Sequence, residues 1–527
     1  MSDQPTLTNT VADPHLMLAF EGNEVPEWVS QSLQHGRPAG FTLFRGWNIE
    51  SPSQAAELTT DLQARNQGDQ PLLIATDLEG GQLQALAGST PFSGNMALGA
   101  TGDEDLARKV GTALGRELRG VGINVNYAPA VDVATLPRNP SLGVRSFGSD
   151  PGSVTALGAA VSAGMADSGV LATAKHFPGK GEAAVDPHYE LPLLDLTRER
   201  MDRVELAPFS RLFAAGIPLT MVGHYLVPAL TGSATEPISV SRQGLSALRE
   251  DLGFGGVIIS DALDMKALDQ GSAQVVEFIA MINAGIDLLL CMPDPELRGR
   301  AITALEKGHE RGLISDTSLA SSRQRIELLR SSIPESEPDP SVVGSAEHLA
   351  LASRLAERSI TLVRDDAGAL PLATSGRLLV LEPEPSNVTP ADTTALYPPV
   401  LADELARYHP STTARVYPQA PSEGDISGLL ELASDHDVIV VGTVVAPPAQ
   451  GRLVTELVAT GKPVIAIALR TPFDILEYPS VSAYVATYSS HQPAMAALAS
   501  KLFGQQGFSG KLPAPIEGLY PLGHGLG

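Results

Sequence analysis

An ammonium–imidazole pair and a carboxylate–imidazole pair lie within fourteen residues in the first half of the chain. Lys175 and His176 end an apolar run, and a loop rich in glycine and proline then leads to Asp186 and His188. A carboxylate two residues from an imidazole can orient the ring while the ring transfers a proton. An unperturbed histidine pKa of about 6.5 suits both donation and acceptance near neutrality. The pattern therefore predicts acid–base chemistry at a strand end.

The same loop allows two other interpretations. Gly179-Lys-Gly-Glu-Ala-Ala184 matches the glycine pattern of dinucleotide-binding folds, which need a helix directly after it. Pro187 disfavours the α conformation for the residue before it and so argues against that helix. In the second interpretation, Lys175 and His176 are only the polar end of a strand. Four such groups close together favour acid–base chemistry over both.

Two carboxylates, Asp77 and Asp261, directly follow apolar runs elsewhere in the chain. A carboxylate that attacks an anomeric carbon, opposite a proton donor, is the minimum requirement for retaining glycoside hydrolysis. In this interpretation Asp261 is the nucleophile, and His188 protonates the leaving oxygen and then activates water. Asp264 is expected in a loop or a first helical turn, and Glu79, beside two glycines, in a turn.

Eight short apolar runs recur over the first 300 residues, with helix-length polar-patterned stretches between them. They are Leu16–Phe20, Gly40–Phe44, Leu72–Thr76, Ile123–Tyr127, Leu171–Ala174, Pro218–Val222, Val257–Ser260 and Ile286–Leu290. Runs that are mostly apolar suit strands buried on both faces, and strand–helix alternation implies parallel pairing. Helices are expected from a capping box at Ser51 to Leu62, over 103–118 and over 272–284. The pattern predicts a (β/α)8 TIM-type barrel.

The residues that follow these runs support the barrel, because its chemistry lies at the carboxyl ends of the strands. They are Glu21, Arg45, Asp77, Asp132, Lys175 with His176, His224, Asp261 and Cys291. Asp132 is the loosest of them, five residues beyond its run. Seven of the eight positions are ionisable, whereas a purely structural face would collect mainly Ser, Asn and Thr.

A segment rich in proline and acidic residues, Ser331–Pro340, is typical of a linker. It predicts a catalytic barrel over 1–330, a linker over 331–345 and a second domain over 346–527. A helix over 347–358 and further strands are expected in the second domain, which we interpret as a smaller α/β sandwich. The strand candidates are Ile360–Val363, Arg377–Leu381, Val438–Val441 and Pro463–Ala468.

Composition limits the classes of partner. The chain has 527 residues, too many for one ordinary core, and a net charge of −24, which argues against binding to nucleic acid or an anionic membrane. Its single cysteine, Cys291, excludes a disulfide framework and a cysteine-based metal cluster, and the histidines lack ligand spacing. No basic leader or membrane-length apolar run is seen. We expect a cytoplasmic protein, monomeric by default, with no metal and no cofactor.

The sequence resembles glycoside hydrolase family 3, specifically its bacterial β-N-acetylglucosaminidase branch in the two-domain form. The resemblance covers nearly the whole chain, and the segment from Lys175 to His188 with the downstream Ser260-Asp261 is its most specific part. The matching segments are Thr76–Gln82, Gly122–Pro129, Arg145–Gly148, Lys175–Gly181 with Asp186–His188, Ser260-Asp261, Gly461–Ala466, Thr487–Ser489 and Tyr520–Gly525.

The resemblance implies a role for each site residue. Asp261 would be the nucleophile, and Asp186 and His188 the acid/base dyad on a mobile loop. Other residues would hold the N-acetylglucosamine: they are Asp77, Arg145, Lys175, His176 and, with less support, His224. The implied substrate is a small carbohydrate, N-acetylglucosamine linked β-1,4 to a muramic unit, in cell-wall recycling. Retaining hydrolysis needs no cofactor.

Three residues depart from the pattern of the branch: Gln82 stands where arginine is common, Lys180 where histidine is common, and Pro187 where serine is common. Loss of the arginine would weaken substrate binding or packing at the barrel mouth, Lys180 would keep a cation on the loop, and Pro187 would stiffen it. His491 and His524 are candidates for contact with the site, but an exposed or capping role is favoured for both.

Three alternatives to hydrolysis of N-acetylglucosaminides stay open. Some members of the branch look able to use phosphate instead of water, and a histidine acid/base would not repel phosphate. A broader β-glucosidase or β-xylosidase would use the same scaffold, and so would a non-catalytic sugar-binding protein. The intact Asp261, Asp186 and His188 argue against the last of these. The aglycone, the need for a stem peptide and the role of the second domain are not readable from the sequence.

Overall fold

The first part of the molecule is a closed barrel of eight parallel strands. The computed structural model describes residues 6–7, 10–268 and 271–527. The barrel strands are β1 (Leu16–Ala19), β2 (Gly40–Thr42), β3 (Leu73–Thr76), β6 (Val125–Asn126), β7 (Leu171–Phe177), β8 (Leu219–Val222), β9 (Val257–Ala262) and β10 (Leu288–Leu290). They follow one another around the barrel in chain order, and β10 closes on β1. Each of the eight predicted runs overlaps a barrel strand, so the predicted fold is confirmed.

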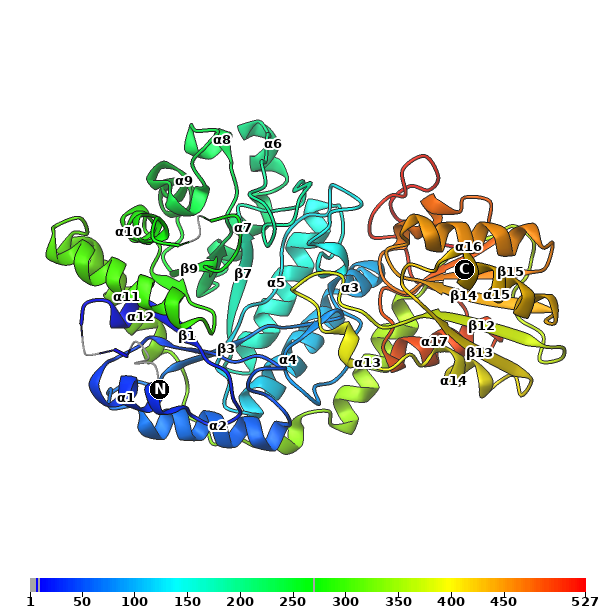
Figure 1. Ribbon diagram of the computed structural model, residues 1–527, viewed down its shortest axis with the longest axis horizontal. Coiled ribbons are helices and arrows are strands. Elements are labelled where there is room, and N and C mark those ends of the chain that lie inside the picture. Colours follow the sequence, from blue (N-terminus) through cyan, green and yellow to red (C-terminus); the bar gives the residue numbers. More distant parts are fainter. Residues whose placement is uncertain (1–5, 8–9, 269–270) are drawn as a thin grey trace.

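Helices surround the barrel (Figure 1). They are α1 (Glu27–His35), α2 (Pro52–Arg65), α3 (Asn95–Thr101), α4 (Glu104–Gly120), α5 (Pro151–Asp167), α6 (Arg198–Arg203), α7 (Ala207–Ala214), α8 (Pro228–Thr231), α9 (Arg242–Ser246), α10 (Gln274–Ala284), α11 (Pro295–Glu310) and α12 (Asp316–Ser331). The N-cap of α2 is Ser51, whose side chain accepts from Gln54 N as predicted. The Gln54 side chain, however, accepts from Glu50 N instead of Ser51 N, so the capping box is only half formed.

The strands are apolar throughout because both of their faces are buried. Met17, Leu73, Val125 and Leu288 pack with one another in a cluster separate from the one that contains Leu16, Ile74 and Leu289. Two strands continue beyond their predicted ends. β9 continues two residues beyond Ser260, and β7 continues three residues beyond Ala174 and includes Lys175 and His176. These two side chains find buried polar partners, and the strand can therefore continue through them.

The second part of the molecule is a six-stranded sheet with helices on both faces (Figure 1). Its strands are β11 (Thr361–Asp365), β12 (Leu378–Pro383), β13 (Thr412–Tyr417), β14 (Val438–Thr443), β15 (Val464–Ala468) and β16 (Ala483–Ala486), in the order β11-β16-β15-β14-β12-β13. Only β11 is antiparallel. The helices are α13 (Ala346–Ser359), α14 (Leu401–Ala406), α15 (Glu423–Ser434), α16 (Pro448–Ala459) and α17 (Gln492–Leu502). The predicted α/β domain is thus confirmed, while β13 and β16 were not predicted.

Alternate residues of β12 show why this domain has two helical layers. Leu379 and Leu381 pack in the cluster that contains residues of α15 and α16, whereas Leu378 and Val380 pack in the cluster that contains residues of α14 and α17. The parallel sheet therefore buries both of its faces.

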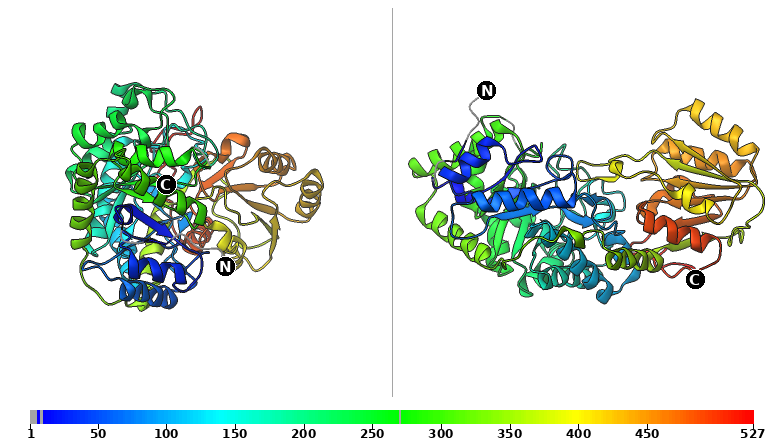
Figure 2. Two further views of the ribbon diagram at one scale, coloured as in Figure 1. Left: turned by 60° about the vertical axis from the view of Figure 1, so that its left-hand side comes forward. Right: turned by 90° about the horizontal axis from the view of Figure 1, so that it is seen from below.

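The junction between the two parts is anchored at a buried carboxylate. Glu117 of α4 accepts hydrogen bonds from Thr90 Oγ1 at 2.5 Å, from Gly344 N at 3.1 Å and from His348 Nδ1 at 2.9 Å. His348 lies in the first turn of α13, which packs against α3 and α17. Figure 2 shows the two lobes from two further directions.

A second contact between the lobes involves the hairpin after β3, formed by β4 (Leu78–Gly80) and β5 (Leu83–Gln84). We call residues 385–397 of the second domain the docking loop. Its Thr393 donates to Gln82 O from both N and Oγ1, at 2.8 and 3.0 Å. His491 Nε2 lies 2.7 Å from Gly81 O. The exposed role expected for His491 is therefore wrong, because its side chain is buried in this contact. His491 is also the N-cap residue of α17, although its side chain makes no capping hydrogen bond.

We expect His491 to make stability depend on pH. Burial lowers its pKa to about 4, so the unfolded chain binds a proton below pH 6.5 that the folded chain does not. The free energy of unfolding that the neutral His491 contributes is therefore lost as the pH falls from 6.5 to 4. At pH 4.5 this loss is about 2.5 kcal/mol. In urea unfolding at pH 7 and 4.5, His491→Gln should lose less stability on acidification than the wild type.

The control for this experiment is His35→Gln, at an exposed position on α1. It should show the same acid loss as the wild type. An equal acid loss in His491→Gln would contradict the prediction.

Among the described residues, no helix has both the length and the apolar character needed to cross a bilayer.

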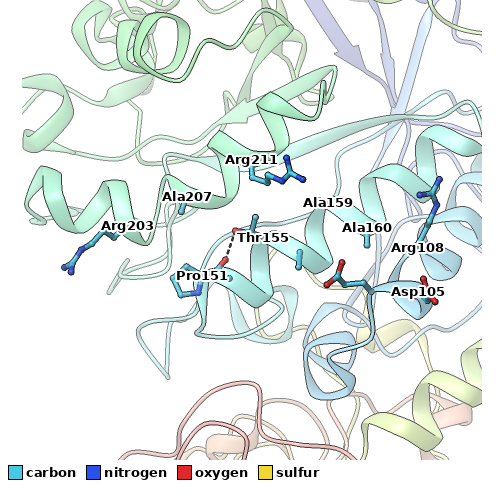
Figure 3. A pocket seen from close by; sticks show the side chains of 12 residues that line it. Asp105, Arg108, Pro151, Thr155, Ala159, Ala160, Arg203, Ala207 and Arg211 are labelled. Atoms are coloured by element: carbon cyan, nitrogen blue, oxygen red, sulfur yellow. Dashed lines mark hydrogen bonds between the residues drawn. The ribbon is translucent and has the colours of Figure 1, made fainter.

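An open groove of about 630 Å³ lies on the outer wall of the barrel, between α4, α5 and α7 (Figure 3). Small residues of α5 such as Ala156 and Ala159 line it, together with Arg203 and Arg211. It contains none of the residues predicted to be catalytic and is therefore a separate feature.

Candidate active site

The carboxyl ends of the barrel strands bring the predicted site residues to one edge of the barrel. Asp77 follows β3, Lys175 and His176 lie near the end of β7, His224 follows β8 and Asp261 is near the end of β9. Not every predicted strand-end residue joins this group. Glu21 is exposed, Cys291 is buried, and Arg45 lies over the ring of Tyr397 in the docking loop.

Lys175 joins two carboxylates beneath the barrel mouth. Its Nζ lies 2.6 Å from Asp77 Oδ1 and 2.5 Å from Glu79 Oε1. Burial alone would lower the pKa of Lys175, but the two carboxylates raise it above its usual value. The Asp77 side chain is 20% exposed, whereas Lys175 and Glu79 are almost fully buried. Asp77 is thus the member of this group that can accept hydrogen bonds from a ligand.

Glu79 has a larger role than the predicted turn residue. It binds Arg145 in a bidentate ion pair, with 2.9 Å from Nε to Oε2 and 2.8 Å from NH2 to Oε1. Burial opposes ionisation of Glu79, but Arg145 and Lys175 hold its pKa well below the usual range. Arg145 also donates from NH1 to Ser141 O at 3.2 Å. The available signal was a carboxylate two residues after Asp77, in a segment flanked by glycines.

His176 is held at both ring nitrogens. Nδ1 lies 2.8 Å from Asp132 Oδ2, and Nε2 lies 3.2 Å from NH2 of Arg145. Because a guanidinium can only donate, Nε2 must accept and Nδ1 must carry the proton. Burial lowers the pKa of His176 well below its usual value, which agrees with a neutral ring. Asp132 therefore orients this ring, although it was the loosest of the predicted strand-end residues.

The Asp186–His188 pair lies on the loop after β7. His188 Nδ1 is 2.6 Å from Asp186 Oδ1, and the backbone N of His188 donates to the same oxygen at 3.0 Å. Asp186 is buried, whereas the His188 side chain is 22% exposed. Burial opposes ionisation of Asp186, but the hydrogen bond from His188 lowers its pKa overall. The pair therefore has an anchored carboxylate and an imidazole whose Nε2 is available to a ligand.

This loop does not continue as a helix, which excludes the dinucleotide interpretation for the described residues 178–190. Asn139 Nδ2 fixes the start of the loop by donating to Lys180 O at 2.7 Å. Pro187 O accepts from Ala267 N at 3.2 Å near the loop's end.

Asp261 lies at the end of β9, and its Oδ1 accepts from Ala262 N at 2.9 Å. Within the described residues Oδ2 has no hydrogen-bond partner. Burial would raise the pKa of Asp261, but the surrounding basic side chains, among them Lys180 and His188, lower it. His224, which is fully buried, approaches Ser239 Oγ with its Nδ1 at 2.9 Å. Its Nε2 has no partner in the described part of the chain. Asp261 is therefore an ionised carboxylate with one free oxygen.

Lys180 is a buried cation without an ion-pair partner within 4.0 Å among the described residues, and only 1% of its surface is exposed. Burial and Arg145 lower its pKa to about 8, although Asp132, Asp261 and Asp186 act in the opposite direction. The lysine that departs from the pattern of the branch thus supplies positive potential to three carboxylates of the site.

We expect Lys180→Met to stabilise the protein. The folded chain releases the lysine proton near pH 8 and the unfolded chain near 10.5, so below pH 8 the buried charge opposes folding by about 3 kcal/mol. Wild-type stability should rise between pH 8 and 10.5, and this rise should be absent in the variant. Denaturant unfolding at pH 7 and pH 10 measures both effects.

The matched control is Lys109→Met, at an exposed lysine of α4. It should leave stability within about 0.5 kcal/mol at both pH values. Destabilisation by Lys180→Met at pH 7 would contradict the expectation, because the ammonium would then contribute favourably to the fold.

No group of three or more His, Cys, Asp or Glu side chains in the described ranges is arranged to hold a metal ion. The arrangement instead offers an ionised carboxylate, a carboxylate-oriented imidazole and a network of buried ion pairs at the barrel mouth. These are the components of acid–base and nucleophilic catalysis on a polar, hydroxyl-rich ligand.

Comparison with known proteins gives matches to both domains. The family model for the glycosyl hydrolase family 3 N-terminal domain matches residues 17–329, and that for the C-terminal domain matches residues 360–518. Beta-hexosaminidase A of Pseudoalteromonas piscicida is 31% identical, over 94% of this chain and 92% of that protein. A protein of Cellulomonas fimi named beta-N-acetylglucosaminidase/beta-glucosidase is 28% identical, over 93% of this chain and 90% of that protein.

A solved structure is similar over almost the same extent. It is a glycoside hydrolase family 3 beta-N-acetylglucosaminidase from Paenibacillus sp. str. FPU-7, with 34% identity and a TM-score of 0.89. The superposition covers 96% of this chain and 98% of that one. The similarity therefore includes both domains and their arrangement.

Proposed function

The chain belongs to glycoside hydrolase family 3, and we propose that it releases terminal β-linked N-acetylglucosamine from saccharides by retaining hydrolysis. The observation that carries this proposal is the Asp186–His188 pair, whose partly exposed imidazole is close enough to Asp261 to help lower the pKa of that carboxyl. The names of the relatives from Pseudoalteromonas piscicida and Paenibacillus support N-acetylglucosamine as the sugar.

In the first step, Asp261 Oδ2 attacks the anomeric carbon and the bond from that carbon to the leaving oxygen breaks. The protonated His188 donates from Nε2 to the leaving oxygen. Asp186 keeps the ring oriented and stabilises its positive charge before the transfer. The product of this step is a glycosyl ester on Asp261, formed with inversion at the anomeric carbon.

In the second step, the neutral His188 accepts a proton from water at Nε2. The hydroxide oxygen attacks the anomeric carbon, and the bond to Asp261 breaks. This second inversion restores the β configuration and returns His188 to its protonated form. One residue serves as acid and then as base because the pKa of an imidazole lies close to neutrality.

The sugar would be held by the group below the barrel mouth. Asp77 is placed to accept from sugar hydroxyls, and Lys175 lies against it. Most donors of Arg145 are already hydrogen-bonded to Glu79 and Ser141 O, and His176 Nδ1 is hydrogen-bonded to Asp132. Arg145 and His176 would therefore mainly position the sugar-binding groups. These roles, and that of His224, are part of the proposal.

The physiological substrate we propose is a muropeptide-type fragment, with N-acetylglucosamine linked β-1,4 to a muramic unit. Lys180 supports it, because an added cation near the site suits an anionic aglycone. With this substrate we propose a role in cell-wall recycling; the cytoplasm as its location and the monomer as its default state are separate parts of the proposal.

Two further activities have one supporting observation each. Phosphorolysis is favoured by an imidazole acid/base, which is uncharged when phosphate would approach and so does not repel it. A broader β-glucosidase is favoured by the double name of the Cellulomonas fimi relative.

The test is release of 4-nitrophenol from its β-N-acetylglucosaminide and its β-glucoside, with and without phosphate. The proposal predicts cleavage of the N-acetylglucosaminide, no effect of phosphate, and β-N-acetylglucosamine as the first product seen by NMR. A sugar 1-phosphate would establish phosphorolysis, and cleavage of the glucoside alone would reject the proposed sugar.

A further inference from the structure

A cavity of about 230 Å³ lies between the two domains. From the barrel it is lined by Gln82 and the loop 137–143, and from the second domain by residues of the docking loop and of 445–446 and 470–474. Pockets for whole drug-sized ligands have about 300–1,000 Å³. The size of this cavity therefore suits a single ring of a larger molecule.

The barrel wall of the cavity is also a wall of the candidate active site. Ser141 lines the cavity and accepts from Arg145 NH1 through its carbonyl oxygen at 3.2 Å. Asn139 lines it too and donates to the carbonyl oxygens of Lys180 and Gly181 at 2.7 and 3.1 Å. The cavity is thus one residue layer from the groups that hold Arg145 and the loop that carries Asp186 and His188.

The charged groups of the lining already have ion-pair or hydrogen-bond partners. Arg138 NH1 lies 2.6 Å from Glu477, and Arg470 NH2 lies 2.5 Å from Asp392. Asp474 accepts from Thr443 Oγ1 and from the N of residue 446, at 2.7 and 3.0 Å. An anionic ligand would therefore find no unpaired cation among the described lining residues. Asp474 has no ion-pair partner in the described part of the chain, but it is buried and already accepts two hydrogen bonds, so the lining suits a neutral ligand.

Unused polar groups remain in the lining. Thr389 is 8% exposed, and its Oγ1 is buried without a hydrogen-bond partner in the described part of the chain. A buried hydroxyl without a partner raises the free energy of the folded protein. A ligand that hydrogen-bonds to it removes this cost, and the bond therefore contributes more binding free energy than one that only replaces a bond to water. The Thr471 hydroxyl and Gln82 Oε1 also lack a partner among residues 6–7, 10–268 and 271–527.

Apolar side chains complete the lining. Phe473 is buried, and the barrel contributes Pro137 and Pro140. Val388 and Val445 are 40% and 41% exposed, and Val445 has φ of 46°, a left-handed conformation that is rare for a β-branched residue. Such strain is commonly retained at ligand-binding positions. Hydroxyl and amide groups beside apolar surfaces match a pyranose ring, which presents both.

We propose that this interdomain cavity binds one neutral pyranose unit of a saccharide, with a ring hydroxyl on Thr389 and the ring's C–H face on the apolar lining. This rests on the proposed function, because that function makes saccharides the ligand class. The unit belongs either to the substrate, beyond the bond that is cleaved, or to a separate saccharide, and the two sources share this chemistry.

The experiment compares the wild type with Val388→Trp, which fills the cavity, and with Thr389→Val, which removes only the hydroxyl. The control is Val416→Trp, at a valine of β13 that is 44% exposed and does not line the cavity. Kinetics are measured with 4-nitrophenyl β-N-acetylglucosaminide and with β-1,4-linked N-acetylglucosamine dimers to pentamers. Calorimetry measures binding of the thio-linked tetramer, which a hydrolase does not cleave.

If the unit is part of the substrate, KM for the longer oligomers should rise about tenfold in Val388→Trp and about two- to tenfold in Thr389→Val. In both variants, KM for the nitrophenyl glycoside should stay within twofold of the wild-type value. In Val416→Trp, KM for the oligomers and KM for the nitrophenyl glycoside should both stay within twofold of the wild type. If the saccharide is separate, KM stays constant and the thio-tetramer stoichiometry falls from two to one in Val388→Trp. Either result supports the cavity site.

Equal kinetics and equal binding in all four proteins would overturn it. A wild type that cleaves none of these substrates would reject the proposed function, while the thio-tetramer calorimetry would still decide whether the cavity binds a saccharide. Thermal unfolding of each variant shows whether a loss reflects the cavity or the fold.

Discussion

Asp261→Ala is expected to lower kcat/KM for 4-nitrophenyl β-N-acetylglucosaminide by about 10⁴- to 10⁶-fold, the range seen when a covalent nucleophile is removed. Asp261 is an ionised carboxylate whose Oδ2 is free among the described residues, and neither His188 nor Asp186 can replace it, because they are paired with each other. The measurement is steady-state nitrophenol release.

Azide distinguishes loss of the nucleophile from loss of the fold. In the space left by Asp261→Ala, azide can attack the anomeric carbon directly, and a single inversion then gives the α-glycosyl azide. Asp264→Ala is the matched control, because Asp264 lies three residues further on, in a turn, with an exposed side chain. Asp264→Ala should keep most of the activity and give no α-glycosyl azide. Retention of more than a tenth of the activity in Asp261→Ala would reject Asp261 as the nucleophile.

His188→Ala is expected to have an effect that depends on the leaving group. Proton donation by a positioned side chain contributes about 10²- to 10⁴-fold, and this contribution is needed for a sugar leaving group. A nitrophenolate leaves without a proton. The first step should therefore survive with the nitrophenyl glycoside and fall by about 10²- to 10⁴-fold with the β-1,4-linked dimer.

Pre-steady-state and steady-state rates separate the two steps. Because His188 also activates water, His188→Ala should show a burst of nitrophenol followed by slow turnover, as the glycosyl ester accumulates. Asp186→Asn should also lower the turnover rate after the burst, but by less than His188→Ala. The His188 ring keeps a hydrogen-bond partner in this variant but loses the negative charge of the carboxylate. His309→Gln, at a surface histidine of α11, is the control. Equal losses with both leaving groups would contradict an acid role for His188.

Local patterns in the sequence were sufficient for the barrel. Strands buried on both faces must be apolar along their whole length, and that property can be read without knowing the partner strands. β13 and β16 were missed for opposite reasons. β13 is an edge strand with exposed residues such as Arg415 and Val416, so its run is not apolar. β16 is apolar and fully buried, so its own residues carried the strand signal and it was overlooked.

The Asp186–His188 pair is also readable from sequence, because its two members are separated by one residue and their hydrogen bonds are local. Glu79 could not be assigned in this way. Its partners, Arg145 and Lys175, are 66 and 96 residues away, and a carboxylate beside two glycines is more often in a turn. The burial of Lys180 is equally invisible, since a lysine on a glycine loop is ordinarily exposed.

By itself, then, the sequence determined the barrel, the second α/β domain, the hydrogen-bonded pair of Asp186 and His188 and the positions of the strand-end carboxylates, because each depends on patterns within a few residues. Only the tertiary structure decided that Glu79 joins the site, that His491 contacts the barrel and that Thr389 is left without a partner beside an interdomain cavity. Each of these depends on distances between segments far apart in the chain. A polar group that is buried without a hydrogen-bond partner raises the free energy of the folded state, and only the tertiary structure shows which groups these are.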